Sequence, residues 1–212
     1  MGGAASSKCI VLVVGLDASG KTSIMHKLGW GLVTEKIVTI GCSVDTLSPD
    51  CGGVRAFKGK GLGDFSMTAL DLIHKEEILF RLRHALTEIL DPMGACNGVV
   101  FVVDAHDNDR LDEEGATIRR TSSAKELFAA FLALQLNDRL VVPATAPVLV
   151  FANKQDLSGA VPVVDLIKRL DLASLGGRRW HVQGCSATTG DGLEDGMDWL
   201  LSELAKKAVL GK

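Results

Sequence analysis

A glycine-rich segment near the amino terminus carries the residue types that hold phosphate groups. Residues 15–22, here called the P-loop, have the sequence GLDASGKT and match the spacing GxxxxGK[ST]. The apolar run CIVLVV precedes this segment and an amphipathic stretch follows it, which predicts a turn between a strand and a helix. Backbone N–H groups of such a turn surround phosphate oxygens, helped by the positive end of the helix dipole.

The side chains of the P-loop indicate a nucleotide bound together with Mg²⁺. We expect Lys21 to reach the β- and γ-phosphates and the Thr22 hydroxyl to bind the metal ion. A glycine-rich turn that binds nothing is the alternative, but the strand, the glycines, the lysine and the threonine would then all have to coincide. The residues expected to contact the nucleotide here are Asp17, Ala18, Ser19, Gly20, Lys21, Thr22 and Ser23.

A second polar segment, FANKQD at residues 151–156, predicts which base is bound. It ends an apolar run, and ligands of open α/β sheets bind where the strands end. The Asp156 carboxylate can accept from both the ring N1–H and the N2 amino group of guanine, whereas adenine has an acceptor at the ring position. We expect Asn153 to orient the loop and meet the base edge, and the stem of Lys154 to cover the ring. These residues alone would also suit an N-cap and turn.

A third segment, CSATTG at residues 185–190, follows the predicted strand HVQGC and is here called the base loop. Its small side chains allow the backbone to approach a base, and the Ala187 N–H can donate to the guanine carbonyl. Ser186 and Thr188 flank that donor. The segment is a weak signal alone, but it completes the pocket that Asp156 begins.

Three short apolar runs predict the central strands of a parallel sheet, at residues 9–14, 98–103 and 146–151. Their nearly continuous, β-branched character is typical of strands buried on both faces. Helical periodicities lie between and after them, beginning at Lys21, Lys75, Ala124, Val163 and Asp195. Because strands and helices alternate, we predict a doubly wound α/β fold.

Two weaker segments, residues 38–47 and 65–70, predict a hairpin. Alternation of residue types in FSMTAL suits a strand with two different faces. The glycine-rich residues 48–64 between them are too long for a tight turn, and we interpret them as a mobile loop rather than a linker between domains. One domain is therefore expected over residues 9–208, with short tails at 1–8 and 209–212.

Composition and charge argue against several other classes of protein. The 212 residues include 47% hydrophobic and 23% charged residues, which is ordinary for one globular domain. A formal net charge of -3 with no evident basic face argues against a nucleic-acid partner. The five cysteines have no CxxC spacing, so they indicate neither a disulfide framework nor a zinc site. No apolar run approaches the ~20 residues that span a bilayer, and we expect a cytoplasmic protein.

Five segments together resemble the ADP-ribosylation factor-like (Arf-like) small GTPases. They are GLDASGKTS at 15–23, VTIGCSVD at 38–45, FVVDAHDNDR at 101–110, FANKQDL at 151–157 and SATTGDGLEDGMDWL at 186–200. The resemblance implies a Ras-like P-loop NTPase fold, with a six-stranded, mostly parallel sheet and helices on both faces. It also implies GTP and GDP as ligands with Mg²⁺, and two switch segments that reorganise around the γ-phosphate. Thr39 resembles the switch I threonine that joins the Mg²⁺ shell.

The second switch departs from this family. After FSMTAL the family continues with Asp, any residue, Gly, Gly and Gln, whereas this chain continues with Asp71, Leu72, Ile73, His74 and Lys75. Asp71 remains as the residue that would hold Mg²⁺ through water. His74 replaces a glycine whose N–H meets the γ-phosphate, and Lys75 replaces a glutamine that orients the attacking water.

Lysine has three donors and no acceptor, so Lys75 cannot align water as glutamine does. We therefore predict slow or absent intrinsic GTP hydrolysis, and we assign no catalytic residue. The alternative is that Lys75 only begins the following helix and points into solvent, while residues of a partner rescue hydrolysis.

The amino terminus, MGGAAS, matches the N-myristoylation pattern, with Gly2 as the acceptor after removal of Met1. A short disordered tail is the alternative. One myristoyl chain gives only marginal membrane binding, with K of about 10⁴ M⁻¹. Because no dense polybasic patch supplements it, we expect reversible membrane contact, peripheral on endomembranes.

Three functions fit the sequence. The favoured one is a guanine-nucleotide switch that recruits effectors at membranes in vesicle trafficking when GTP is bound. The second is a conventional GTPase that depends on a GTPase-activating protein, and the third is an interaction module with a vestigial nucleotide site. In the first two cases we expect a monomer that meets effectors through its switch regions, together with an exchange factor.

Overall fold

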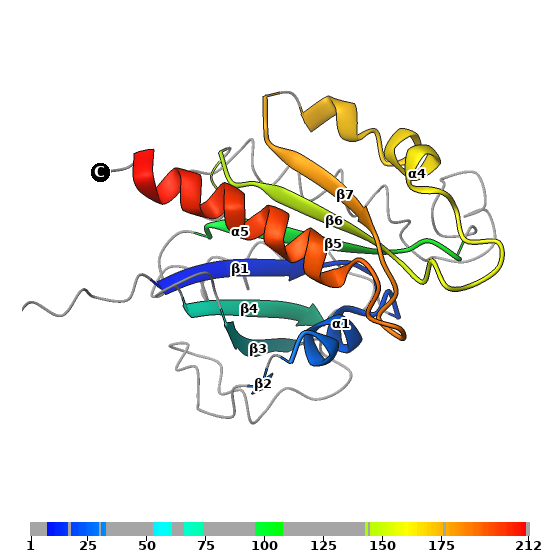
Figure 1. The fold of residues 1–212 in the computed structure, drawn as a ribbon, viewed down its shortest axis with the longest axis horizontal. Coiled ribbons are helices and arrows are strands. Elements are labelled where there is room, and N and C mark those ends of the chain that lie inside the picture. Colours follow the sequence, from blue (N-terminus) through cyan, green and yellow to red (C-terminus); the bar gives the residue numbers. More distant parts are fainter. Residues whose placement is uncertain are drawn as a thin grey trace, which may run out of the picture.

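The computed structural model in Figure 1 describes residues 8–16, 18–29, 31–32, 53–60, 66–73, 96–107, 143, 145–175 and 177–210. In these ranges, the strands are β1 (Lys8–Val14), β2 (Gly31–Leu32), β3 (Gly53–Lys60), β4 (Ser66–Ile73), β5 (Gly98–Asp104), β6 (Val148–Asn153) and β7 (Trp180–Gly184). The helices are α1 (Lys21–Lys27), α4 (Val163–Arg169), the 3-10 helix η4 (Leu172–Leu175) and α5 (Leu193–Leu210).

The described strands form one sheet in the order β2-β3-β4-β1-β5-β6-β7. Neighbours from β4 to β7 are parallel, whereas β2 and β3 pair antiparallel along one edge. The order changes direction at β1, because β4 lies on one side of it and β5 on the other. The prediction of a doubly wound, mostly parallel α/β fold is confirmed.

The hairpin differs from its prediction. The antiparallel partner of β4 is β3, at Gly53–Lys60, inside the segment that we interpreted as a mobile loop, so that interpretation is wrong for these residues. Glycines lower strand propensity, but eight register pairs with β4 form the ladder here, so pairing with the sheet overrides local preference. The strand expected at residues 38–47 lies outside the described residues.

Two smaller differences concern element lengths. The described sheet has seven strands rather than six, because the two-residue β2 pairs with β3. Two residues are too few to produce an alternation in the sequence. The helix predicted from Asp195 begins at Leu193, directly after Gly192, whose φ of 71° lies in the left-handed region. The helices predicted from Lys21 and Val163 are confirmed, whereas those predicted from Lys75 and Ala124 lie outside the described residues.

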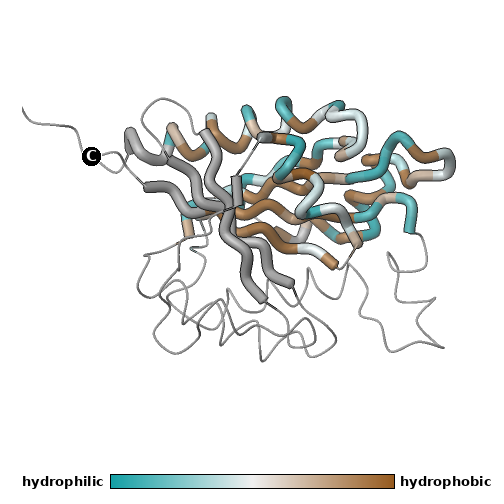
Figure 2. Tube along the Cα trace, turned by 90° about the horizontal axis from the view of Figure 1, so that it is seen from below, coloured by the Kyte–Doolittle hydropathy of each residue, from teal (hydrophilic) through white to brown (hydrophobic). Residues whose placement is uncertain are grey.

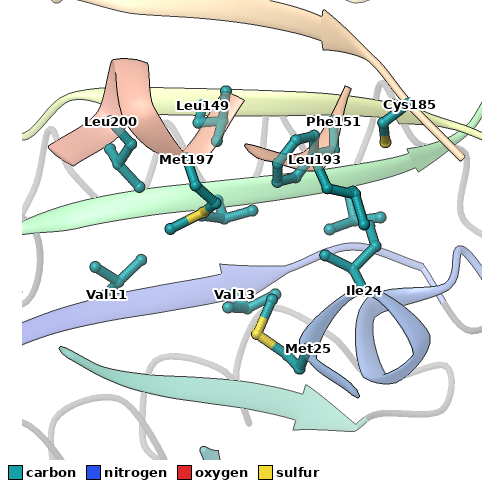
Figure 3. Close-up of a cluster of buried hydrophobic side chains, with 12 residues drawn as sticks. Val11, Val13, Ile24, Met25, Leu149, Phe151, Cys185, Leu193, Met197 and Leu200 are labelled. Atoms are coloured by element: carbon teal, nitrogen blue, oxygen red, sulfur yellow. The ribbon is translucent and has the colours of Figure 1, made fainter. Parts of the chain in front are cut away.

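The core lies between the central strands and the helices α1 and α5. Alternate residues of β1, β5 and β6 meet both helices in one cluster (Figure 3), which includes Val11, Val13, Ile24, Met25, Val100, Val102, Leu149, Phe151, Leu193, Met197 and Leu200. The residues between them on the strands, such as Leu12, Phe101 and Val150, are also buried, so the central strands are covered on both faces.

Figure 2 shows the same distribution, with hydrophobic residues gathered along the central strands and hydrophilic ones on the outer helices and loops. This packing fixes the carboxyl ends of the strands relative to α1. Among the described helices, none combines the length and the apolar character needed to cross a membrane.

Candidate functional site

The three predicted segments meet at one edge of the sheet. The P-loop follows β1, residues 153–156 follow β6, and the base loop follows β7. Register pairs Asp104 with Asn153 and Ala152 with Gly184, so these strands end at similar heights. Open α/β sheets bind ligands at the carboxyl ends of their strands, beside the point where the strand order reverses.

The backbone of the P-loop depends on its glycines. A Cβ atom on Gly15 would collide with the carbonyl oxygen of Val102 on the neighbouring β5. Gly20 has a φ of 96°, and a Cβ atom there would collide with the Asn153 amide nitrogen. Ala18 also has a positive φ, of 57°, although it is not glycine. Such local strain is found where a fold holds a functional loop in a fixed shape.

The Lys21 side chain lies against the P-loop. Its Nζ donates to the carbonyl oxygens of Gly15 at 3.0 Å and Leu16 at 2.8 Å, and the residue is only 8% exposed. The ammonium charge is therefore held next to a loop that has no room for added side chains at Gly15 and Gly20. A compact backbone loop with a fixed cation suits a nucleotide phosphate.

The other predicted P-loop residues differ in environment. Thr22 is partly buried in the first turn of α1, and Ser23 is exposed. The Ser19 side chain is 1% exposed, and its hydroxyl is a buried side-chain oxygen without a hydrogen-bond partner in the described part of the chain. That hydroxyl lies 3.0 Å from the position that a Cβ atom on Gly15 would occupy. Asp17 lies outside the described residues.

The side chain of Asn153 joins two of the three segments. Its amide nitrogen donates to the Ser19 carbonyl oxygen at 2.8 Å, and its amide oxygen accepts from the Ala187 N–H at 2.9 Å. The residue is 1% exposed; its bond to Ser19 is buried, and its bond to the half-buried Ala187 is partly buried. Asn153 thus connects the P-loop to the base loop. The guanine carbonyl that we expect at the Ala187 N–H would have to share this donor.

Lys154 and Asp156 follow in the same turn. Lys154 has a φ of 67°, and its ammonium makes a salt bridge of 2.5 Å with the Asp104 carboxylate at the end of β5. The other oxygen of Asp104 accepts from the His106 N–H at 3.0 Å. These bonds hold the stem of Lys154 between the ends of β5 and β6. Asp156 is exposed, so its carboxylate is accessible to a ligand.

The Asp156 carboxylate lies close enough to the base loop to influence it electrostatically. Burial raises the pKa of the Cys185 thiol to about 12, and the negative charge of Asp156 adds to this effect. Cys185 is buried, with its sulfur 3.9 Å from the Asn153 amide oxygen. The thiol therefore stays protonated near neutral pH and acts as a small, buried apolar residue at the start of the base loop.

The base loop is held in shape by hydrogen bonds within the loop itself. The Ser186 hydroxyl accepts from the N–H groups of Thr188 at 3.2 Å and Thr189 at 3.1 Å, and Ser186 is 2% exposed. The Gly190 N–H donates to the Ser186 carbonyl at 2.8 Å. Ala187 is half-buried and Thr188 is exposed. The loop is therefore a compact turn that presents the Ala187 N–H next to Asn153.

Several predicted residues are not located by the structure. Thr39, His74, Lys75 and Gly2 lie outside the described residues, and only the backbone of Asp71 is described, opposite Val13 of β1. Among the described side chains, no group of three or more His, Cys, Asp or Glu is arranged to hold a metal ion. The predicted oxygen ligands, Thr22, Thr39 and water held by Asp71, are the kind that Mg²⁺ prefers.

Sequence reasoning missed two contacts of the site. Asp104 lies within FVVDAHDNDR, but nothing in the sequence assigns its carboxylate to Lys154. Lys27 lies in the helix predicted from Lys21, and its Nζ donates to the Thr188 carbonyl at 3.0 Å. The position of Asp104 at the end of an apolar run next to the FANKQD strand was the only available signal. For Lys27 the sequence offered none, because its partner is 161 residues away.

The fold and the site together define a P-loop nucleotide-binding protein of the doubly wound α/β class. A family model described as the ADP-ribosylation factor family matches residues 3–62 and 92–204, which is well over half of the chain. The chain belongs to the ADP-ribosylation factor family and is a small GTP-binding switch protein.

GTPases of this family bind GTP and GDP, generally with Mg²⁺, and interact with regulators and effectors. The family match does not extend over residues 63–91, which contain the predicted second switch from Asp71 to Lys75.

Proposed function

We propose that this protein is an Arf-like switch that retains GTP because it hydrolyses it slowly or not at all, and that recruits effectors at membranes while GTP is bound. The observation that carries the proposal is the Asn153 side chain, whose two hydrogen bonds hold the P-loop and the base loop together. A nucleotide between these loops would have its phosphates on one and its base on the other.

The proposed contacts follow from the groups that each loop presents. Lys21 would leave the carbonyls of Gly15 and Leu16 to bind the phosphates, and the Asp156 carboxylate would accept from the guanine ring. Bound Mg²⁺ would neutralise phosphate charge, and Thr22, in the first turn of α1, is the described residue that we expect to hold it. The Lys154 stem, fixed by Asp104, would cover the ring.

Retention of GTP is proposed from the residues at positions 74 and 75. A histidine in place of glycine restricts the backbone approach to the γ-phosphate, and a lysine lacks the acceptor that aligns water. Related GTPases that have the glutamine already turn over at only about 10⁻⁴ to 10⁻³ per second without a partner. Loss of water alignment should reduce that rate further, so GTP would remain bound until it is exchanged.

Single-turnover hydrolysis tests this step directly. The natural chain and the double variant His74→Gly with Lys75→Gln are loaded with GTP, and phosphate release is followed without any partner protein. We expect the double variant to be faster. A natural rate equal to or above that of the double variant would show that these positions do not limit hydrolysis.

Membrane action is proposed from Gly2, the acceptor in MGGAAS. A single acyl chain binds bilayers only marginally, so attachment would be reversible and would depend on a second contact, such as an effector. Mass spectrometry of the native protein recovered from membranes is the measurement. An unmodified amino terminus on that protein would remove this part of the proposal.

The nucleotide extracted from the purified natural chain tests the proposal as a whole. We expect GTP; predominantly GDP would favour a conventional GTPase that relies on an activating partner, and no nucleotide would favour a vestigial site. Calorimetry at physiological magnesium complements this measurement by comparing GDP with ADP. Lack of any preference for the guanine nucleotide would refute the role given to Asp156.

A further inference from the structure

Lys27 connects the helix that follows the P-loop to the base loop. Its Nζ donates to the Thr188 carbonyl at 3.0 Å, and Thr188 lies 161 residues further along the chain. Lys168 of α4 and Lys206 of α5, in contrast, form ion pairs with carboxylates three residues away on their own helices. Figure 1 shows the loop between β7 and α5 coming down beside α1. Lys27 therefore makes a tertiary contact rather than a local one.

A second contact reinforces the first. Gly190, at the end of the base loop, has a φ of 99°, and a Cβ atom there would come within 2.9 Å of Lys27 Cε and 3.8 Å of Cγ. The lysine stem thus lies over the glycine while the ammonium reaches the carbonyl of Thr188. The side chain covers the base loop from Gly190 to Thr188, on the side next to α1.

These contacts place the Ala187 N–H between two anchors. On one side the Asn153 amide oxygen accepts this N–H at 2.9 Å, and on the other Lys27 holds the carbonyl of the next residue, Thr188. The Ser186 hydroxyl bonds the following N–H groups and links the two anchors into one turn. A shift at Thr188 would therefore move the donor that we expect to meet the guanine carbonyl.

We infer that Lys27 is a positioning residue for guanine recognition, which acts by holding the base loop against α1. This inference rests on the proposed function, because it assumes that the base loop meets the base. Lys27 does not touch the nucleotide in this role. It fixes the distance between the end of the phosphate-binding helix and the loop that reads the 6-position of the base.

The test compares affinities of the full chain for GDP and for 6-thioguanosine diphosphate. The two nucleotides share the N1–H and N2 groups that Asp156 would bind, but sulfur is a weaker acceptor than oxygen at the 6-position. Lys27→Met removes the donor and keeps an apolar stem. Affinities are measured by competition against a fluorescent GDP derivative at saturating magnesium, and thermal unfolding without nucleotide checks that each variant folds.

We expect Lys27→Met to weaken GDP binding about three- to tenfold, the effect of one partly solvated hydrogen bond from a charged donor. The loss should be clearly smaller for 6-thioguanosine diphosphate, and Lys27→Arg should restore most of the GDP affinity. Lys168→Met is the matched control, because it also removes an exposed lysine from the last turn of a seven-residue helix. It should bind both nucleotides as the natural chain does.

The outcomes separate the inference from the proposed function. Natural-chain affinity in Lys27→Met, or an equal loss for both nucleotides, would overturn the inference alone, since an equal loss is what a purely structural role predicts. Failure of the natural chain to bind GDP would overturn the proposed function and the inference with it. If Lys27→Met fails to fold, Lys27→Gln takes its place, because it also removes the ammonium; unequal losses for the two nucleotides then support the inference and equal losses overturn it.

Discussion

Replacement of Asn153 by alanine should weaken GDP binding far more than replacement of Gln155, a side chain of the same turn that does not contact the P-loop or the base loop. The substitution removes both the donor to the Ser19 carbonyl at 2.8 Å and the acceptor of the Ala187 N–H at 2.9 Å. Each bond contributes about 0.5–1.5 kcal/mol net, and a buried polar group left without a partner costs about 1–3 kcal/mol. The magnitude therefore depends on whether water can replace the amide.

The two ends of the Asn153 amide differ in that respect. Ser19 is 1% exposed, so we expect its carbonyl to carry the full cost, whereas Ala187 is half-buried and water can reach its N–H. Together the losses come to about 2–4 kcal/mol, or about 30- to 700-fold in affinity if all of it appears in binding. Calorimetry with GDP measures the binding part, and thermal unfolding without nucleotide measures the part that appears in stability.

Two further variants sharpen this test. Asn153→Asp keeps an oxygen for the Ala187 N–H but turns a second oxygen toward the Ser19 carbonyl, so it should lose at least as much affinity as Asn153→Ala. Gln155→Ala removes a side chain of the same turn whose amide donates to the Val161 carbonyl, away from the P-loop, and should leave affinity within about threefold. If Asn153→Ala bound GDP as tightly as Gln155→Ala and kept its melting temperature, the connecting role of Asn153 would be refuted.

Three other changes have defined expectations. Gly20→Ala should lower GDP affinity at least about 100-fold, because Gly20 has a φ of 96° and the new Cβ atom would collide with the Asn153 amide. Gly29→Ala is the control, because Gly29 also has a positive φ but has open space around it, and it should lower stability without changing affinity. Calorimetry with GDP measures both affinities. Ser19→Ala removes a buried hydroxyl that has no hydrogen-bond partner among the described residues, so the free energy of unfolding should rise by ~1 kcal/mol. The melting temperature should then rise by about 2–4 °C, and a lower melting temperature would contradict this prediction. The pKa of the Cys185 thiol rises from 9.0 to about 12 on folding, so the unfolded chain loses this proton first. Stability should be unaffected by this group below pH 9 and fall between pH 9 and 12, and urea unfolding of Cys185→Ala should show a shallower decline.

The parts of the fold and site that could be predicted are those encoded by neighbouring residues. The P-loop combines its glycines, lysine and threonine within eight residues, directly after an apolar strand, so motif and context support each other. The central strands were equally clear, because strands buried on both faces leave continuous apolar runs. Placement of the FANKQD and CSATTG segments beside the P-loop followed from the rule that parallel strands end at one edge.

The parts that could not be predicted depend on partners far along the chain. β3 has a glycine at each end of GVRAFKG, and only its pairing with β4 makes it a strand. Lys27 and Asp104 look like surface charges in the sequence, since their partners, Thr188 and Lys154, become neighbours only when the sheet forms. The buried Ser19 hydroxyl was likewise grouped with the residues that bind phosphate, although its side chain lies beneath the loop, beside Gly15.

The residues expected to hold the nucleotide and those expected to govern its hydrolysis follow different strands, which bears on whether the protein holds or cleaves its nucleotide. The groups proposed to hold it lie after β1, β6 and β7, where the bonds of Asn153 and Lys27 connect them. The groups proposed to govern hydrolysis, His74 and Lys75, follow β4 in the sequence and lie outside the described residues. Because these positions follow a different strand in the sequence from the segments expected to meet the base, we expect substitutions there to change cleavage without weakening guanine binding. A switch with this division would be turned off by nucleotide exchange rather than by hydrolysis, so its off-rate for GTP, and not its catalytic rate, would set the lifetime of the active state.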